Sequence, residues 1–253
     1  MTVPRSGADH YLGLLKKVLT NVIYEDDRFP HWGLPDPGYE REARVTGFDW
    51  PTVAHTMVGL ARLDNVQECL ESVLADGVPG DFVETGVWRG GTCILARGVL
   101  SVHGVTDRTV WVVDSFEGIP TTDEGSNSLD QEMKLHEHND VLAVPMKEVE
   151  RNFERYGLLD DQVRFLPGWF KDTLPDAPIE RVAVLRLDGD LYESTMDSLT
   201  HLYPKLSVGG YVIVDDYILP ACAQAVHDFR ERHGIEDELT PIDQVACYWR
   251  RSA

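Results

Sequence analysis

The feature that most constrains the fold is an alternation of short apolar runs with segments of helical periodicity, which continues from residue 81 to the end of the chain. Short apolar runs between turn-forming residues are typical of buried strands, and apolar positions at helical spacing are typical of the helices that cover them. The pattern predicts strands at 81–86, 109–116, 162–168, 182–190, 210–217 and 243–251, with helices at 91–102, 145–157, 192–206 and 220–233. Strands that alternate with helices predict an α/β fold with a mostly parallel sheet and right-handed crossovers.

The sequence before the first predicted strand indicates an N-terminal cap. Residues 9–24 carry apolar residues at helical spacing, whereas residues 25–50 are rich in Asp, Pro, Gly and Arg and predict an irregular segment. We expect Pro51 to be the first residue of a helix that continues to Ala75, because proline is favoured at the first helical position. The expected organisation is a helical and irregular cap at 1–75 and a single compact unit at 76–253.

A second irregular segment is predicted at residues 121–141, which are polar, acidic and placed between two strand signals. Long segments of this kind in compact domains are usually lids, binding loops or disordered regions.

Composition argues against several classes of partner. The formal net charge is −20, so no basic stripe is available for nucleic acid or for an anionic membrane surface. Cys69, Cys93, Cys222 and Cys247 have no C-x-x-C spacing and are expected to be free thiols in a reducing compartment. No apolar run resembles a signal peptide or is long enough to span a bilayer, so we expect a cytoplasmic protein.

Acidic residues end two neighbouring predicted strands. Asp188 and Asp190 flank a glycine at the end of one strand, and Asp215 and Asp216 follow the apolar run of the next. The ends of parallel strands lie side by side, so Asp188, Asp215 and Asp216 are expected to converge on a divalent cation such as Mg²⁺. Each acid could instead cap the helix that begins just beyond it.

A glycine-rich turn after the first predicted strand indicates a cofactor site. The turn ETGVWRGG at 84–91 places glycines where the backbone can approach a ligand, and it opens a helix whose N-terminus offers free N–H groups. Its spacing is not the G-x-G-x-x-G of dinucleotide enzymes, and Trp88 inside the turn suits a pyrophosphate poorly. The turn better fits the amino-acid end of S-adenosylmethionine, although an ordinary βα turn could have the same glycines.

Two further strand ends extend this site. Asp114 ends the second strand, where a carboxylate can accept both ribose hydroxyls of a nucleotide, although an aspartate there can also be a simple cap. Trp169, which follows Gly168 at the end of the third strand, could stack on adenine or pack in the core. Together with the glycine-rich turn, these residues predict a nucleoside-containing cofactor.

Methyl transfer to a hydroxyl is the chemistry that this combination favours. A hydroxyl keeps its proton at neutral pH and is then a poor nucleophile, because it is a weak acid. A bound metal lowers the pKa of the hydroxyl and so favours the reactive, deprotonated oxygen. A general base must then take the proton. Asp190 is not needed in a metal set of three aspartates, so it is the candidate base.

At these residues the chain resembles the Mg²⁺-dependent sugar O-methyltransferases of antibiotic biosynthesis, typified by macrocin O-methyltransferase. The similar stretches are PTVAHTM (51–57), ETGVWRGG (84–91), VDSFEGIP (113–120), RYGLLDDQVRFLPGWFKDTLP (155–175), LRLDGDLYESTMD (185–197), GGYVIVDDY (209–217) and YWRR (248–251). The resemblance implies a Rossmann-like class I fold of S-adenosylmethionine-dependent methyltransferases, with an antiparallel last strand.

The resemblance also implies roles for individual residues. It places Mg²⁺ on Asp188, Asp215 and Asp216 and the catalytic base at Asp190. The residues expected to contact or surround S-adenosylmethionine are Thr52, Met57, Glu84, Thr85, Gly86, Trp88, Arg89, Gly90, Asp114, Ser115, Gly168 and Trp169. Members of the family tend to associate through the N-terminal part, so a homodimer or homotetramer is expected.

The acceptor implied by the resemblance is a glycosylated small molecule. Relatives methylate a hydroxyl of a deoxysugar on a macrolide or an aminocoumarin, with the metal on two vicinal hydroxyls. Residues 25–50 and 121–141 depart from the macrolide enzymes and are expected to cover the acceptor, so the aglycone and the sugar stay open. The alternatives are a catechol-type O-methyltransferase, a nicotinamide oxidoreductase and a non-catalytic nucleoside- or metal-binding module.

Overall fold

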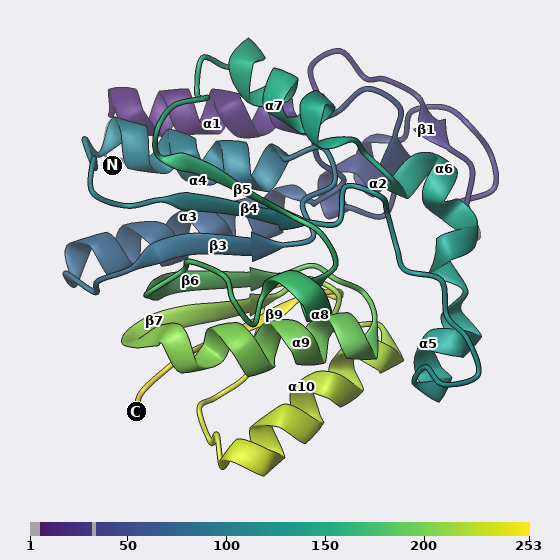
Figure 1. Cartoon of the computed structure of the whole chain (residues 1–253). Helices are drawn as coiled ribbons and strands as arrows, with labels where there is room; N and C mark the ends of the chain where they lie inside the picture. The colour runs from purple at the N-terminus through teal and green to yellow at the C-terminus, as the bar shows by residue number, and fades with distance from the viewer. Residues whose placement is uncertain (1–5, 32–33) are drawn as a thin grey trace.

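The computed structural model describes residues 6–31 and 34–253, and within them it contains a seven-stranded sheet between two layers of helices (Figure 1). The strands lie in the order β5 (Val163–Pro167), β4 (Val110–Asp114), β3 (Asp81–Thr85), β6 (Val182–Leu187), β7 (Leu206–Val214), β9 (Cys247–Arg250) and β8 (Thr240–Pro241). The first five are parallel to one another, whereas β9 runs antiparallel to β7 and β8. The predicted α/β fold, including the antiparallel last strand, is confirmed.

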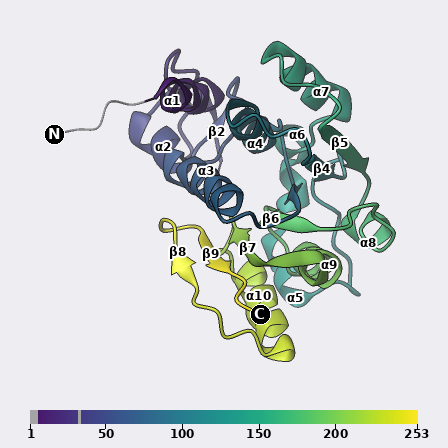
Figure 2. The ribbon, with the colours of Figure 1, turned by 90° about the vertical axis from the view of Figure 1, so that its left-hand side faces the viewer.

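Helices cover both faces of the sheet, as Figure 2 shows from the side. One layer contains α1 (Gly7–Leu19), α3 (Leu60–Ala75), α4 (Gly91–Val102) and α7 (Met146–Arg155), and the other contains α8 (Phe170–Thr173), α9 (Tyr192–Leu202) and α10 (Pro220–His233). Helices α4 and α10 begin and end at the predicted residues. Helix α9 ends before the predicted residue 206, in a short 3₁₀ helix η2 (Tyr203–Lys205).

The sheet is buried on both faces, which explains the continuous apolar runs in its strands. All six residues of β6 are buried, and its apolar side chains are divided between the two helical layers. Val184 belongs to the core cluster that includes residues of α1, α3 and α4, whereas Leu185 belongs to the cluster that includes residues of α9 and α10. The four cysteines are buried free thiols, as predicted. Among the residues described, none of the helices combines the length and the apolar character that crossing a membrane would require.

The predicted helix from Pro51 to Ala75 is wrong in its first part. Pro51 belongs to a two-residue strand β2 (Trp50–Pro51) that pairs antiparallel with β1 (Arg28–Phe29), and α3 begins only at Leu60. The N–H groups of Val53 and Ala54 donate to the carboxylate of Asp26 at 2.6 and 3.2 Å. A side chain 27 residues away in the sequence therefore holds this stretch extended, and local periodicity does not reveal such a partner.

The two segments predicted as irregular contain short helices. The N-terminal one contains β1 and α2 (Arg41–Thr46), and α1 before it ends at Leu19 rather than at residue 24. The acidic stretch 121–141 contains α5 (Ser128–Met133), the 3₁₀ helix η1 (Leu135–His138) and α6 (Asn139–Leu142). In Figure 1 it passes down one side of the molecule, from α6 to α5 and the vicinity of α10.

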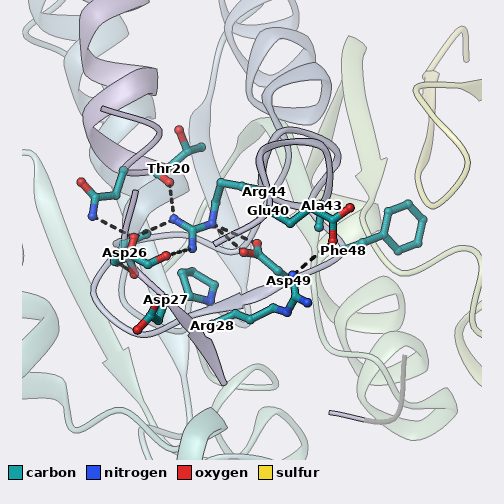
Figure 3. Close-up of polar contacts among 12 residues, drawn as sticks. Thr20, Asp26, Asp27, Arg28, Glu40, Ala43, Arg44, Phe48 and Asp49 are labelled. Atoms are coloured by element: carbon teal, nitrogen blue, oxygen red, sulfur yellow. Dashed lines mark hydrogen bonds and ion pairs between the residues drawn. The ribbon is translucent and has the colours of Figure 1, made fainter. Parts of the chain in front are cut away.

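A buried arginine organises the N-terminal segment (Figure 3). Arg44 of α2 is 1% exposed and pairs with Asp26 at 2.6 Å and with Asp49 at 2.8 Å. It also donates to the backbone oxygens of Thr20 and Asp26. Arg44 thereby joins the end of α1 to the carboxylate of Asp26, which in turn fixes the extended stretch that begins at Thr52.

We expect Arg44→Met to lower the free energy of unfolding by about 3–5 kcal/mol, because two buried carboxylates lose the cation that pairs them. Chemical denaturation measures this change. Arg41→Met is the matched control, since Arg41 lies on the exposed side of the same helix and its loss should change stability by less than about 0.5 kcal/mol. Equal losses in the two variants would contradict the role of Arg44.

Candidate active site

The carboxyl ends of the parallel strands open into a cavity of about 890 Å³, at the edge where ligands bind in open α/β sheets. Ten of the predicted site residues line this cavity: Met57, Gly86, Trp88, Asp114, Ser115, Trp169, Asp188, Asp190, Asp215 and Asp216. Six others are not among its lining residues: Thr52, Glu84, Thr85, Arg89, Gly90 and Gly168.

The three aspartates predicted as metal ligands come together. Strands β6 and β7 are paired at Leu187 and Val214, so Asp188 and Asp215, the next residues along, emerge side by side. Carboxylate oxygens of Asp188, Asp215 and Asp216 all lie within 4.8 Å of one another. Such a set of hard oxygen donors is the kind that binds Mg²⁺ in proteins.

These acids do not cap the helices that follow them. The N-cap residue of α9 is Leu191 and that of α10 is Leu219, and neither helix receives a side-chain hydrogen bond from its N-cap residue. The alternative that the strand-end acids serve as local helix caps is therefore wrong, and their convergence needs another explanation.

Arg186 lies beneath this cluster and was missed in the sequence. It is fully buried in β6, where its guanidinium forms ion pairs with Glu84, Asp188 and Asp215. The distance to Asp188 is 2.6 Å. A signal existed, because Glu84 and Arg186 are opposite charges inside two apolar runs, and they are directly paired in the register of β3 and β6.

A second missed arginine, Arg62 of α3, reaches the cluster from the N-terminal side and lines the cavity. It pairs with the second oxygen of Asp215 at 2.5 Å and with Asp243 at 3.2 Å. It also donates to the backbone oxygens of Thr46 and Gly47. Arg62 thus connects the end of α2 with the acid cluster at the end of β7.

The acids of the cluster differ in how readily they ionise. Burial and two neighbouring aspartates raise the pKa of Asp190 to about 7. Burial and the surrounding aspartates raise the pKa of Asp216 well above its usual range. Burial would also raise the pKa of Asp215, but Arg186 and Arg62 outweigh it and hold that pKa below its usual value. A divalent cation would relieve the remaining repulsion, so the donor set fits Mg²⁺.

The glycine-rich turn lies directly against the acid cluster. Gly86 has a φ of +88°, and a Cβ atom there would stand 1.7 Å from the carbonyl oxygen of Asp188. Only glycine allows this approach of β3 to the end of β6. Gly86 thus serves the packing of the site as well as any approach of a ligand.

Asp114 holds the same turn from the neighbouring strand. Its carboxylate accepts from the N–H of Val87 and from the N–H of Phe116, both at 2.7 Å. Burial raises its pKa, and these hydrogen bonds oppose that effect. Gly168 donates its N–H to the backbone oxygen of Asp114 at 2.9 Å, and Trp169 next to it lines the cavity.

The remaining predicted residues support the site from behind. Arg89 donates to the backbone oxygens of Pro51 and Ala54 at 3.1 and 2.8 Å, which ties the 51–57 stretch to the turn. Thr52 donates its hydroxyl to the backbone oxygen of Asp27.

Glu84 and Thr85 also face away from the cavity. The carboxylate of Glu84 meets Arg186 and accepts from the thiol of Cys93, and burial raises its pKa to about 7. The hydroxyl of Thr85 accepts from Ser198 at 3.1 Å.

Residues 8–251 match the family model of macrocin-O-methyltransferase (TylF). The chain belongs to the macrocin O-methyltransferase family. It is thus an O-methyltransferase with the class I methyltransferase fold, as the resemblance implied. Membership removes the nicotinamide oxidoreductase and the non-catalytic binding module from the alternatives.

Several members of the macrocin O-methyltransferase family are similar over their whole length. The 8-demethyl-8-(2,3-dimethoxy-alpha-L-rhamnosyl)-tetracenomycin-C 4'-O-methyltransferase of Streptomyces olivaceus is 62% identical, over 97% of this chain and 94% of its own. The mycinamicin III 3''-O-methyltransferase of Micromonospora griseorubida is 57% identical, over 99% of each. The structure of the O-methyltransferase NovP has a TM-score of 0.93 at 57% identity and covers 97% of this chain and 100% of its own.

We expect Arg186→Met to destabilise this family member by about 3–5 kcal/mol at pH 8, because three carboxylates lose their common cation. Without the arginine, the pKa of Asp215 in the folded state rises above that of the unfolded chain, and the pKa of Glu84, which burial already raises to about 7, rises further. The destabilisation that these two unpaired carboxylates cause is therefore largest at high pH, and it decreases as they become protonated toward pH 5.

Denaturation at a series of pH values measures this dependence, with Arg164→Met on the exposed side of β5 as the control. A difference between Arg186→Met and the wild type that grows as the pH falls would contradict the assignment.

Proposed function

We propose that the protein transfers the methyl group of S-adenosylmethionine to a hydroxyl of a deoxysugar on an antibiotic-type glycoside, with Mg²⁺ at the acid cluster. The observation that carries the proposal is the position of Asp190, which lines the same cavity as the three clustered aspartates and Asp114. The relatives support the class of acceptor, because one is named for methylating a rhamnosyl tetracenomycin and another for methylating mycinamicin III.

The cofactor would be held between the glycine-rich turn and the ends of β4 and β5. Gly86, Asp114, Ser115 and Trp169 face the cavity there, and Met57 faces it from the 51–57 stretch. When bound, S-adenosylmethionine supplies a methyl group on a positively charged sulfur. The carboxylate of Asp114 suits the ribose hydroxyls, since it lies at the strand end where such contacts are made.

The metal would be held by Asp188, Asp215 and Asp216. When bound, Mg²⁺ lowers the pKa of a hydroxyl group that it contacts. Arg186 and Arg62 keep Asp215 ionised, so at least one ligand needs no deprotonation before it can bind a cation.

Asp190 would act as the general base. It takes the proton of the acceptor hydroxyl while the hydroxyl oxygen forms its bond to the methyl carbon and the bond from that carbon to sulfur breaks. The products are the methyl ether, S-adenosylhomocysteine and a protonated Asp190, which returns its proton to solvent. A pKa of about 7 leaves this carboxyl able to hold and release a proton near neutral pH.

The acceptor would occupy the mouth of the cavity, which is lined by apolar and aromatic side chains. Phe48 and Trp50 come from the N-terminal segment, and Ile218 and Leu219 come from the turn that precedes α10. The ring of Trp50 stacks on that of His31 with centroids 4.8 Å apart. Apolar and aromatic lining in the same cavity as the clustered aspartates supports a sugar joined to an aglycone rather than a small diol.

We expect the purified protein to methylate the rhamnosylated tetracenomycin or mycinamicin III in Mg²⁺ buffer with S-adenosylmethionine, as detected by product mass. Excess chelator should abolish the product, and added Mg²⁺ should restore it. Full turnover in chelator would remove the metal from the proposal. Methylation of a free catechol without any methylation of the glycosides would favour the catechol-type alternative.

We expect Asp190→Asn to lower kcat by about 10²–10⁴ and to leave the Kd of S-adenosylhomocysteine unchanged. Since the base acts in its ionised form, kcat/KM of the wild type should rise with pH and level off above about 7. Bound Mg²⁺ favours the ionised form of Asp190 and should therefore move the rise of kcat/KM to lower pH.

The Asp190→Asn variant should show no such rise of kcat/KM with pH. Asp172→Asn, which changes an exposed residue of α8, is the control. A near-normal rate in Asp190→Asn would rule out this residue as the base.

A further inference from the structure

Helix α9, which begins two residues after Asp190, has no cap of its own. Its N-cap residue is Leu191, whose side chain cannot accept a hydrogen bond. The cap comes from Asp130 in α5, whose carboxylate accepts from the N–H of Tyr192 at 2.6 Å and from the N–H of Glu193 at 3.1 Å. Asp130 is 1% exposed, so this contact is enclosed by the fold. The start of α9 is therefore completed by a residue 62 positions earlier in the chain.

Asp130 belongs to a segment that covers the cavity. We call residues 118–142 the cover segment; its cavity-lining members are Gly118, Ile119, Pro120, Thr121, Thr122, Asp123, Ser126, Leu135 and Leu142. The carboxylate of Glu193 accepts from the N–H of Asn127 at 2.9 Å, which adds a second tie to α9. At its other end, the carbonyl oxygen of Val141 accepts from the indole N–H of Trp88 at 3.0 Å. The cover segment is thus anchored separately to α9 and to the glycine-rich turn.

The residue between the acid cluster and α9 is held in an unusual backbone conformation. Asp190 has a φ of +57°, in the left-handed region that non-glycine residues rarely adopt. Its N–H donates to Asp216 at 3.1 Å on one side. On the other side the chain passes through Leu191 into the first turn of α9, which Asp130 caps. Such a conformation persists only when the surrounding structure fixes it from both sides.

We propose that Asp130 is a positioning residue that couples the docking of the cover segment over the cavity to the placement of Asp190. When the segment is docked, the first turn of α9 is capped and Asp190 is fixed between Asp216 and that turn. When the segment leaves, the first N–H groups of α9 lose their acceptor and the turn that carries Asp190 loosens. The base is thereby set only while the cavity is covered and water is excluded. The part that concerns catalysis rests on the function proposed above for Asp190.

The test compares Asp130→Ala and Asp130→Asn with Glu132→Ala, which removes an exposed acid from the same helix. Hydrogen exchange at the amides of residues 190–193 is measured first, because it does not depend on activity. We expect exchange at Tyr192 and Glu193 to accelerate about 5- to 30-fold in Asp130→Ala. Exchange at Asp190 should accelerate with them. Asp130→Asn keeps one acceptor oxygen and should give a smaller acceleration, and it serves in place of the alanine variant if that variant does not fold.

Kinetics then separate a positioning role from a merely structural one. We expect kcat of Asp130→Ala to fall about tenfold or more, since a misplaced base loses its alignment. The Kd of S-adenosylhomocysteine should be unchanged, because the tie between Val141 and Trp88 remains. Glu132→Ala should match the wild type in both measurements.

Two results would overturn the proposal. Unchanged exchange at residues 190–193 in Asp130→Ala would show that the cap does not hold the base. Faster exchange at Tyr192 and Glu193 with normal kcat and normal exchange at Asp190 would show that the cap and the base are not coupled. If the wild type fails to methylate any acceptor, the proposed function fails, and exchange at Asp190 still decides whether Asp130 positions it.

Discussion

The site depends on one buried guanidinium. Arg186 lies in the middle of the sheet with no exposure to solvent, and it pairs with carboxylates from three strand ends. Such burial is tolerated only because the charges satisfy one another, and removing a partner leaves an uncompensated charge. With Arg62, it allows Asp215 to stay ionised in an apolar setting. The carboxylates around Asp188 still outnumber the arginines, and this surplus of negative charge is what makes a divalent cation a fitting occupant.

Two carboxylates accept hydrogen bonds from backbone N–H groups that are distant in the chain, and they hold two of the segments around the cavity. Asp26, fixed by Arg44, holds the N–H groups of Val53 and Ala54, and so positions the stretch on which Arg89 and the glycine-rich turn rest. Asp130 does the equivalent for α9. In each case the carboxylate replaces a local partner that the sequence does not provide, so the shape of the cavity mouth depends on a few side chains outside the sheet.

Elements that depend on local residues could be predicted from the sequence, whereas elements held by distant side chains could not. Helices α4 and α10 were predicted with correct ends because glycine, proline and apolar spacing specify them locally. The convergence of Asp188, Asp215 and Asp216 was predictable because parallel strands end at a common edge. The extended stretch after Pro51 was not, since its partner Asp26 is far away in the chain.

The orientation of Glu84, a predicted cofactor contact, has a single signal in the sequence, the opposite charge of Arg186 in another apolar run. Glu84 was expected to face the cofactor, but its carboxylate meets Arg186 beneath the cavity floor. Strand registers decide that direction, and the sequence does not state which strand lies beside β3.

The anchoring of two segments around the cavity has a consequence for how new acceptor ranges can arise. The segment with β1, α2 and β2 is tied to the core by Arg62 and Arg89, and the cover segment is tied to it by Trp88 and Asp130. A recombination event that exchanges either segment as a cassette, with its anchoring aspartate included, would alter the lining of the cavity and leave the acid cluster in place. The segments that line the outer cavity and the strand ends that carry the acid cluster are thus separate stretches of the sequence.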